Sequence, residues 1–192
     1  MGIAWPGPAE NARYAPAVQN TSEKAGRPAL LCYDGSEFAK RAIGDSSRVL
    51  GGGPAIVLTI FESLGSALLR HPVPETTELG RQFKEIAQEV VDELDSGSAE
   101  RAQATAAEGA EVARTAGFDA QPEARRALAR AVERDTVTVW RAILDAADEK
   151  DAAVVVLGSR GRSGLGSALL GSVSYGVVHN STRPVLVVPP TA

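Results

Sequence analysis

The segment of this sequence best suited to chemistry is GSRGRSGLGSALLGSVSYG, residues 158–176, which follows the apolar run AAVVVL. Glycine lets a backbone turn sharply and lets a ligand approach without a Cβ in the way. Gly171 and Ser172 stand where a helix should begin, and the peptide N–H groups at a helix start favour an anion. The hydroxyls of Ser172 and Ser174 add donors, and Arg160 adds positive charge. The segment therefore predicts a phosphate-binding cradle.

Two common phosphate motifs are absent from this segment. No Gly-Lys-Ser/Thr follows, so it is not a P-loop, and the spacing differs from the G-x-G-x-x-G dinucleotide fingerprint. A glycine- and serine-rich loop after a strand can also be purely structural. On the residues alone, this structural interpretation stands beside the phosphate site.

The elements that must position this segment are predicted from apolar patterns. Continuous apolar runs predict buried strands at 29–33, 55–61, 152–158 and 184–188. Between 118 and 125, apolar and polar residues alternate, which predicts a half-exposed strand, and Pro122 places it at a sheet edge. These runs alternate with helical segments. The order predicts one α/β domain with an open, five-stranded parallel sheet and helices on both faces.

The sequence also predicts where several helices begin and end. Asp34-Gly35-Ser36-Glu37 predicts a turn and a helix start, and Gly51-Gly52-Gly53 ends that helix. A later segment, 76–116, begins with a strongly amphipathic stripe and is interrupted by Ser96-Gly97-Ser98, so one bent helix and two helices both remain open. A short helix is expected over roughly 172–181. The stripe consists of Leu79, Phe83, Ile86, Ala87, Val90, Val91 and Leu94.

Composition narrows the function classes. The 192-residue chain has a net charge of −4, which argues against a nucleic-acid-binding protein. Its single cysteine, Cys32, cannot form a disulfide framework or a cysteine-based metal site. Apolar runs are too short for a membrane helix, and the amino-terminal residues lack the signal-peptide order, which predicts a cytoplasmic protein. Residues 1–28 are interpreted as a tail and 29–190 as the domain.

The spacing Gly158-x2-Gly161-x9-Gly171-Ser172 resembles the nucleotide-binding signature of the universal stress protein family, G-x2-G-x9-G-[S/T]. The run AAVVVLGSRGRSGLGSALLGSVSYGVVHNSTRPVLVVPP follows the family's order, and ALLCYDGSEFAKRAI is similar to its first strand and turn. The likeness covers about residues 29–190 and is weak over 62–135. It implies the adenine-nucleotide alpha-hydrolase-like fold, with strands in the order 3-2-1-4-5.

The resemblance implies an ATP-binding stress-response regulator and assigns roles to residues. Asp34 would lie at the adenosine end, although it could instead only cap its turn. The backbone around Ile60 would hold the adenine, and the glycine loop would surround the ribose and phosphates. Whether ATP, ADP or AMP is bound stays open, and Mg²⁺ is expected only through the phosphates. The predicted nucleotide site is Asp34, Ile60, Gly158, Ser159, Arg160, Gly161, Gly171, Ser172, Val173 and Ser174.

Two alternatives to a nucleotide-binding regulator remain. One is a slow ATPase or adenylate-transferring enzyme on the same scaffold, although the sequence shows no nucleophile elbow, His-based triad or dedicated metal site and predicts no catalytic residue. The other is a dimeric interaction protein without a nucleotide. In every case the last strand, residues 184–190, is short, apolar and expected at an edge, and the resemblance implies a homodimer through it.

Overall fold

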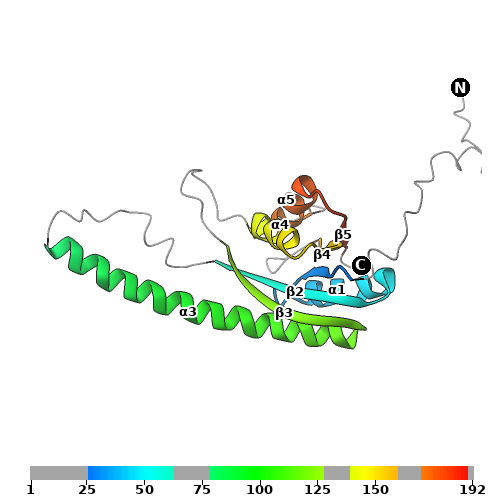
Figure 1. Ribbon diagram of the computed structural model, residues 1–192, viewed down its shortest axis with the longest axis horizontal. Coiled ribbons are helices and arrows are strands. Elements are labelled where there is room, and N and C mark those ends of the chain that lie inside the picture. Colours follow the sequence, from blue (N-terminus) through cyan, green and yellow to red (C-terminus); the bar gives the residue numbers. More distant parts are fainter. Residues whose placement is uncertain (1–25, 63–77, 128–138, 160–169, 190–192) are drawn as a thin grey trace, which may run out of the picture.

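The computed structural model describes residues 26–62, 78–127, 139–159 and 170–189, which form a parallel five-stranded sheet with helices on both faces (Figure 1). The spatial order of the strands is β3-β2-β1-β4-β5, which confirms the predicted fold. The division into a tail and a domain at residue 28 stays a prediction. The strands are β1 (Ala29–Cys32), β2 (Gly53–Glu62), β3 (Phe118–Ala127), β4 (Val154–Gly158) and β5 (Val185–Val188).

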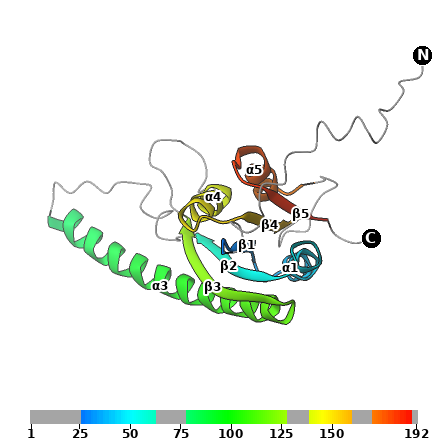
Figure 2. The same ribbon diagram turned by 45° about the vertical axis from the view of Figure 1, so that its right-hand side comes forward.

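Two helices cover each face of the sheet (Figure 2). Helices α1 (Glu37–Leu50) and α3 (Glu78–Thr115) pack on the face to which Leu31 and Val57 point. Helices α4 (Val139–Glu149) and α5 (Ser172–Asn180) pack on the face of Leu30 and Leu58. Successive strand residues point to opposite faces, so a strand covered on both sides needs a continuous apolar run. This explains why the inner strands were predictable.

Helix α1 begins and ends where the sequence predicts. The Ser36 side chain accepts a hydrogen bond from the Ala39 amide and caps the first turn. Gly51 ends the helix with a φ of 77°, a left-handed conformation that glycine adopts without strain. The predicted turn residues at both ends of α1 are confirmed.

Helix α3 runs without a break from Glu78 to Thr115, so the two-helix alternative is wrong. Ser96 and Ser98 do not interrupt it because their hydroxyls donate to the Asp92 and Leu94 carbonyls one turn earlier. Its second half is packed closely: a Cβ atom on Gly109 would lie 2.5 Å from the Tyr33 ring. Small residues in this half therefore let α3 approach the sheet.

Strand β3 forms an edge, as Pro122 predicts, but it is longer than the alternation suggested. It pairs with the whole of β2, from Gly53 opposite Phe118 to Glu62 opposite Ala127. Residues 124–127, which could also have been helical, belong to this strand. Arg126 at its end forms an ion pair with Asp95 of α3, 3.2 Å away.

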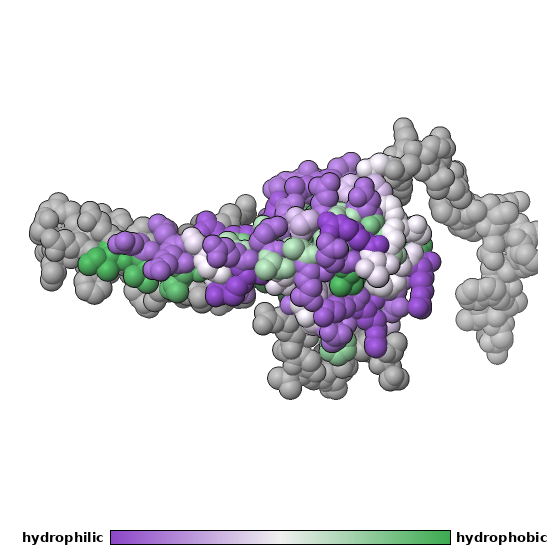
Figure 3. Space-filling view, turned by 90° about the horizontal axis from the view of Figure 1, so that it is seen from below, coloured by the Kyte–Doolittle hydropathy of each residue, from purple (hydrophilic) through white to green (hydrophobic). Residues whose placement is uncertain are grey.

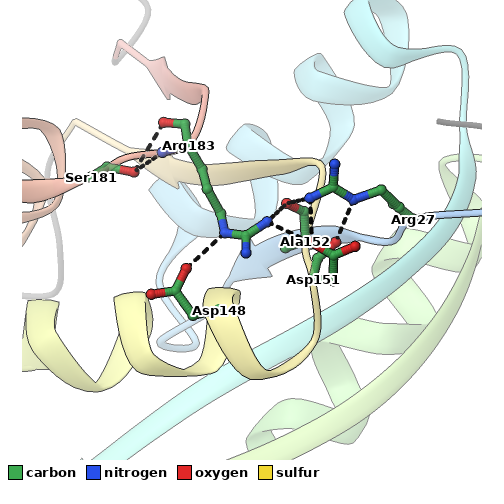
Figure 4. Close-up of polar contacts among 6 residues, drawn as sticks. All are labelled: Arg27, Asp148, Asp151, Ala152, Ser181 and Arg183. Atoms are coloured by element: carbon green, nitrogen blue, oxygen red, sulfur yellow. Dashed lines mark hydrogen bonds and ion pairs between the residues drawn. The ribbon is translucent and has the colours of Figure 1, made fainter. Parts of the chain in front are cut away.

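A cluster of charged side chains closes the amino-terminal end of the sheet (Figure 4). Arg183 donates to Asp148 at 2.9 Å, to Asp151 at 3.1 Å and to the Ala152 carbonyl at 2.7 Å. Arg27 also donates to Asp151. The cluster thereby ties the chain before β1, the turn between α4 and β4, and the turn before β5 to one another.

Candidate functional site

The two ends of the glycine-rich loop are held together at the carboxyl end of β4. The Ser159 amide donates to the Val188 carbonyl at 2.8 Å, which continues the β4–β5 pairing. The Gly171 amide donates to the Ser159 carbonyl at 2.8 Å. The chain therefore leaves the sheet after Ser159 and returns beside it at Gly171. This closure fixes the start of α5 next to the end of β4.

Helix α5 begins without a side-chain cap. Gly171 is its N-cap, with φ −68° and ψ 161°, and supplies no hydrogen bond from a side chain. The amides of the first helical turn have no partner within a helix and carry the positive end of its dipole. The exposed Ser172 and the half-buried Val173 contribute two of these amides. An anion at this position would satisfy them.

The Ser174 hydroxyl has a different role from the one predicted. It is buried and donates to the Gly158 carbonyl at 2.8 Å. A serine hydroxyl has one proton to donate, so in this arrangement it is not available to a phosphate. Ser174 holds α5 against the end of β4 and thereby supports the loop from inside.

Among the described residues, Ser159 has a buried hydroxyl without a hydrogen-bond partner. Its side chain is 4% exposed, and within the described ranges its hydroxyl oxygen has no hydrogen-bond partner. A buried polar group without a hydrogen-bond partner destabilises the protein. A water molecule or an ion bound at the site is one of the explanations for such a group. No other buried side-chain oxygen or nitrogen of the described residues shares this state.

Asp34 lies in the turn that leaves β1. Its Oδ1 accepts a hydrogen bond from the Ser36 amide at 3.0 Å, and Gly35 has a φ of 82°. The carboxylate therefore orders the turn, as the capping alternative predicted. One oxygen in this bond does not exclude the adenosine role, because a carboxylate has several acceptor positions.

The pairing register of the strands places three predicted segments at the same height, at the carboxyl end of the sheet. Cys32 of β1 pairs with Leu58 of β2, and Asp34 and Ile60 each follow two residues later. Leu31 pairs with Val156 of β4, and Gly158 follows two residues later. The chain order reverses between β1 and β4, and ligands bind at the carboxyl ends of strands beside such a reversal. Ile60 itself is half-buried against the core of the α4 and α5 face.

Sequence reasoning missed the polar contacts beneath the Asp34 turn. The Tyr33 hydroxyl donates to Glu108 at 3.0 Å, and Lys40 forms ion pairs of 3.1 Å with Glu108 and Glu37. Burial and the Glu108 contact raise the pKa of Tyr33 to about 12, so it stays protonated and keeps donating. Lys40 and Tyr33 lower the pKa of Glu108. Only the Lys40–Glu37 spacing was visible in the sequence.

Two predicted site residues, Arg160 and Gly161, lie outside the described residues, as does most of the loop. A hollow of about 230 Å³ lies away from this site, between α4 and the turn after α5, where Trp140, Leu144 and Arg183 line it. No group of three or more acidic, histidine or cysteine side chains that could hold a metal occurs in the ranges given above. None of the helices in those ranges is both long enough and apolar enough to cross a bilayer.

Comparison with known protein families shows to which family the chain belongs. The model of the universal stress protein family matches residues 26–189. The chain belongs to this family. The resemblance stated from the Gly158–Ser172 spacing is thereby confirmed, over a span that also includes the 62–135 region where the likeness was weak.

Curated universal stress proteins show both full-length and local similarity. A universal stress protein of Thermus aquaticus is 32% identical over 161 residues, which cover 83% of this chain and 96% of that protein. Universal stress protein YxiE of Bacillus subtilis is 54% identical over 46 residues, which cover 24% of this chain and 31% of YxiE. The chain thus aligns with less than a third of YxiE but with nearly all of the Thermus protein.

Solved structures share the fold. The structure of MJ0577 is 21% identical, with a TM-score of 0.63, and the alignment covers 88% of this chain and 99% of that one. A universal stress protein in complex with cAMP is 24% identical, with a TM-score of 0.48, covering 85% of this chain and 97% of that one. At 21% identity, the similarity to MJ0577 shows that the two chains share a fold.

Proposed function

We propose that this universal stress protein binds an adenine nucleotide, with ATP as the first candidate, at the carboxyl end of its sheet. The uncapped start of α5 carries the proposal, because Gly171 is fixed beside Ser159 by a 2.8 Å hydrogen bond and adds no side chain of its own. The first-turn amides then suit the phosphates. The Ser159 hydroxyl, unpartnered among the described residues, adds a donor or acceptor at the same mouth.

The rest of the nucleotide would extend toward β1 and β2. Asp34 and the backbone around Ile60 lie at the same level of neighbouring strands and would contact the ribose and the adenine. Mg²⁺ would arrive on the phosphates, since the described residues offer no metal-binding group. The bound state would then act as the signal in a stress response, because a ligand that binds only the folded form stabilises it.

Thermal unfolding with ATP, ADP and AMP, each with and without Mg²⁺, tests the proposal. ATP should raise the melting temperature in proportion to the logarithm of its concentration. Failure of all three to shift it at millimolar concentration would overturn nucleotide binding. Release of a nucleotide from freshly purified, denatured protein would identify the resident species.

A charge placed at Ser172 separates binding from folding. Ser172→Asp adds a negative charge at the exposed first turn of α5, which favours the helix but repels phosphate. We expect unchanged or higher stability without ligand and at least tenfold weaker ATP binding. Thr182→Asp adds the same charge in the exposed turn after α5 and should leave binding unchanged.

We also propose a homodimer through the edge strand β5. Pro184 and Val188 direct their carbonyls to β4, so the intervening Val185 and Val187 present their backbone groups to the open edge. Val187→Pro removes an outward N–H group and should abolish this pairing, whereas Val187→Thr keeps it. Light scattering measures the outcome, and an unchanged mass for Val187→Pro would contradict the interface.

A further inference from the structure

The second half of α3 lies against the sheet, whereas its first half projects beyond it with exposed apolar side chains (Figures 1 and 3). Ala102, Ala106 and Ala110 of the second half are buried. Residues four apart share one face of a helix, and small side chains on that face let α3 approach the strands. This packed half is the part of α3 that can hold other segments in place.

The two ends of the turn that carries Asp34 converge on one oxygen atom of α3. Glu108 Oε1 accepts a hydrogen bond of 3.0 Å from the hydroxyl of Tyr33, the residue immediately before Asp34. The same oxygen lies 3.1 Å from Nζ of Lys40, which belongs to the first turn of α1, after the Asp34 turn. One carboxylate of the packed half of α3 therefore bridges the two ends of this turn.

Tyr33 is fixed at its backbone as well as at its hydroxyl. Its amide donates to the Leu58 carbonyl at 2.9 Å, and its carbonyl accepts a hydrogen bond of 2.9 Å from the Thr59 hydroxyl. The side chain is 2% exposed, and its ring lies against Gly109 of α3. Asp34 follows in the chain, so a shift of Tyr33 moves the start of the turn.

The two contacts of Glu108 differ in strength. The side chains of Lys40 and Glu108 are 33% and 53% exposed, and ion pairs with such exposure contribute little. The Tyr33 hydroxyl belongs to a buried side chain, and a buried donor that loses its acceptor destabilises the arrangement around it. The hydrogen bond between Tyr33 and Glu108 is therefore the contact expected to order the turn.

We propose that Glu108 of α3 is a positioning residue for the nucleotide site, acting through Tyr33 on the turn that carries Asp34. This role rests on the proposed nucleotide binding, in which Asp34 contacts the nucleoside part of the ligand. If the turn has the binding geometry in only a fraction of the molecules, the apparent affinity falls by that fraction. Loss of the bond between Tyr33 and Glu108 should therefore weaken ATP binding although Asp34 is unchanged.

Titration calorimetry with ATP tests the role of this hydrogen bond. Tyr33→Phe keeps the ring and removes the hydroxyl, and should weaken binding about fivefold. Glu108→Ala should weaken it at least as much, whereas Glu108→Gln keeps an acceptor oxygen and should restore most of the affinity. Glu111→Ala is the matched control, because it removes an exposed carboxylate of the same helix that pairs with Arg114 instead.

Amide hydrogen exchange of the ligand-free protein tests the turn independently of any nucleotide. The Ser36 amide donates to Asp34 Oδ1 at 3.0 Å, so its exchange rate reports how often the turn opens. Tyr33→Phe and Glu108→Ala should speed this exchange, whereas Glu108→Gln and Glu111→Ala should not. The amides of the central strand β1 should exchange as before, which shows that the opening is local.

The outcomes separate this role from nucleotide binding itself. Equal ATP affinity of Tyr33→Phe, Glu108→Ala and the unchanged protein would overturn the positioning role and leave nucleotide binding in place. If Glu108→Gln bound as weakly as Glu108→Ala, the charge pair with Lys40 would matter instead of the Tyr33 bond, which also overturns the role. If the unchanged protein bound no nucleotide, the proposed function would fail, and Ser36 exchange would still decide whether Glu108 orders the turn.

Discussion

The two ends of the sheet are closed by different chemistry. At the amino-terminal end, Arg27 and Arg183 share Asp151, and Arg183 also reaches Asp148, so charged side chains satisfy one another. At the carboxyl end, backbone groups and small residues make the contacts, and the Ser159 hydroxyl lacks a partner among the described residues. Among the described residues, this spare hydrogen-bonding capacity lies at the carboxyl end, where a ligand site would use it.

The two ends of the sheet also differ in the part they play in the fold. The amino-terminal cluster needs no further ligand, which fits a role in holding three connections of the fold together. The carboxyl end depends on close packing underneath it, where Tyr33 lies between Gly109 and the turn carrying Asp34. The following changes test this contrast, from the largest expected effect to the smallest.

Gly109→Ala should destabilise the protein most, by about 2–3 kcal/mol, because the added Cβ would lie 2.5 Å from the Tyr33 ring and 2.8 Å from Val57. Gly97→Ala is the matched control in the same helix, and its Cβ would meet no atom of the described residues within 4 Å. It should stabilise by up to about 1 kcal/mol. Urea unfolding measures both, and effects of the same sign would contradict close packing beneath the Asp34 turn.

Ser174→Ala should cost about 1–2 kcal/mol, because it removes the 2.8 Å hydrogen bond to the Gly158 carbonyl and leaves that carbonyl without this donor. It should also weaken ATP binding by loosening the start of α5. Ser172→Ala, at the exposed neighbouring position, should change stability by less than about 0.5 kcal/mol. If the two variants unfolded alike, Ser174 would not support the loop.

Arg183→Gln should have a smaller effect that depends on pH. The hydrogen bond from Arg183 and the nearby Arg27 charge lower the pKa of Asp151 in the folded state. A lowered folded pKa contributes stability above the unfolded value, about 3.9, and that contribution is lost as pH falls through the folded value. The stability difference from the unchanged protein should therefore be present at pH 7 and shrink below pH 4.

Denaturant unfolding between pH 3 and pH 7 measures this effect. Arg48→Gln serves as the control, because Arg48 is exposed and its 3.6 Å pair with Asp45 lies outside the cluster. Exposed pairs of this kind contribute little. A constant difference across the pH range for Arg183→Gln would show that Arg183 acts through packing rather than through Asp151.

Sequence patterns predicted the sheet and most of its helices because both depend on local regularities. Continuous apolar runs identified β1, β2, β4 and β5, and Pro122 identified the β3 edge. The sequence could not decide whether α3 is one helix or two, since serine hydroxyls can either end a helix or donate within it. The glycine spacing located the loop and the family, but not which hydroxyl of Ser159 and Ser174 would be left without a partner.

By itself, the sequence determined the parallel sheet, the glycine loop at its carboxyl end and membership of the universal stress protein family, because apolar periodicity and glycine spacing act over short stretches of chain. The tertiary structure decided which groups remain available. Tyr33 and Glu108, or Ser174 and Gly158, meet only after distant segments pack. The exposure of Ile86, Val90 and Leu94 was likewise decided by where the sheet ends beneath α3, which no local pattern encodes.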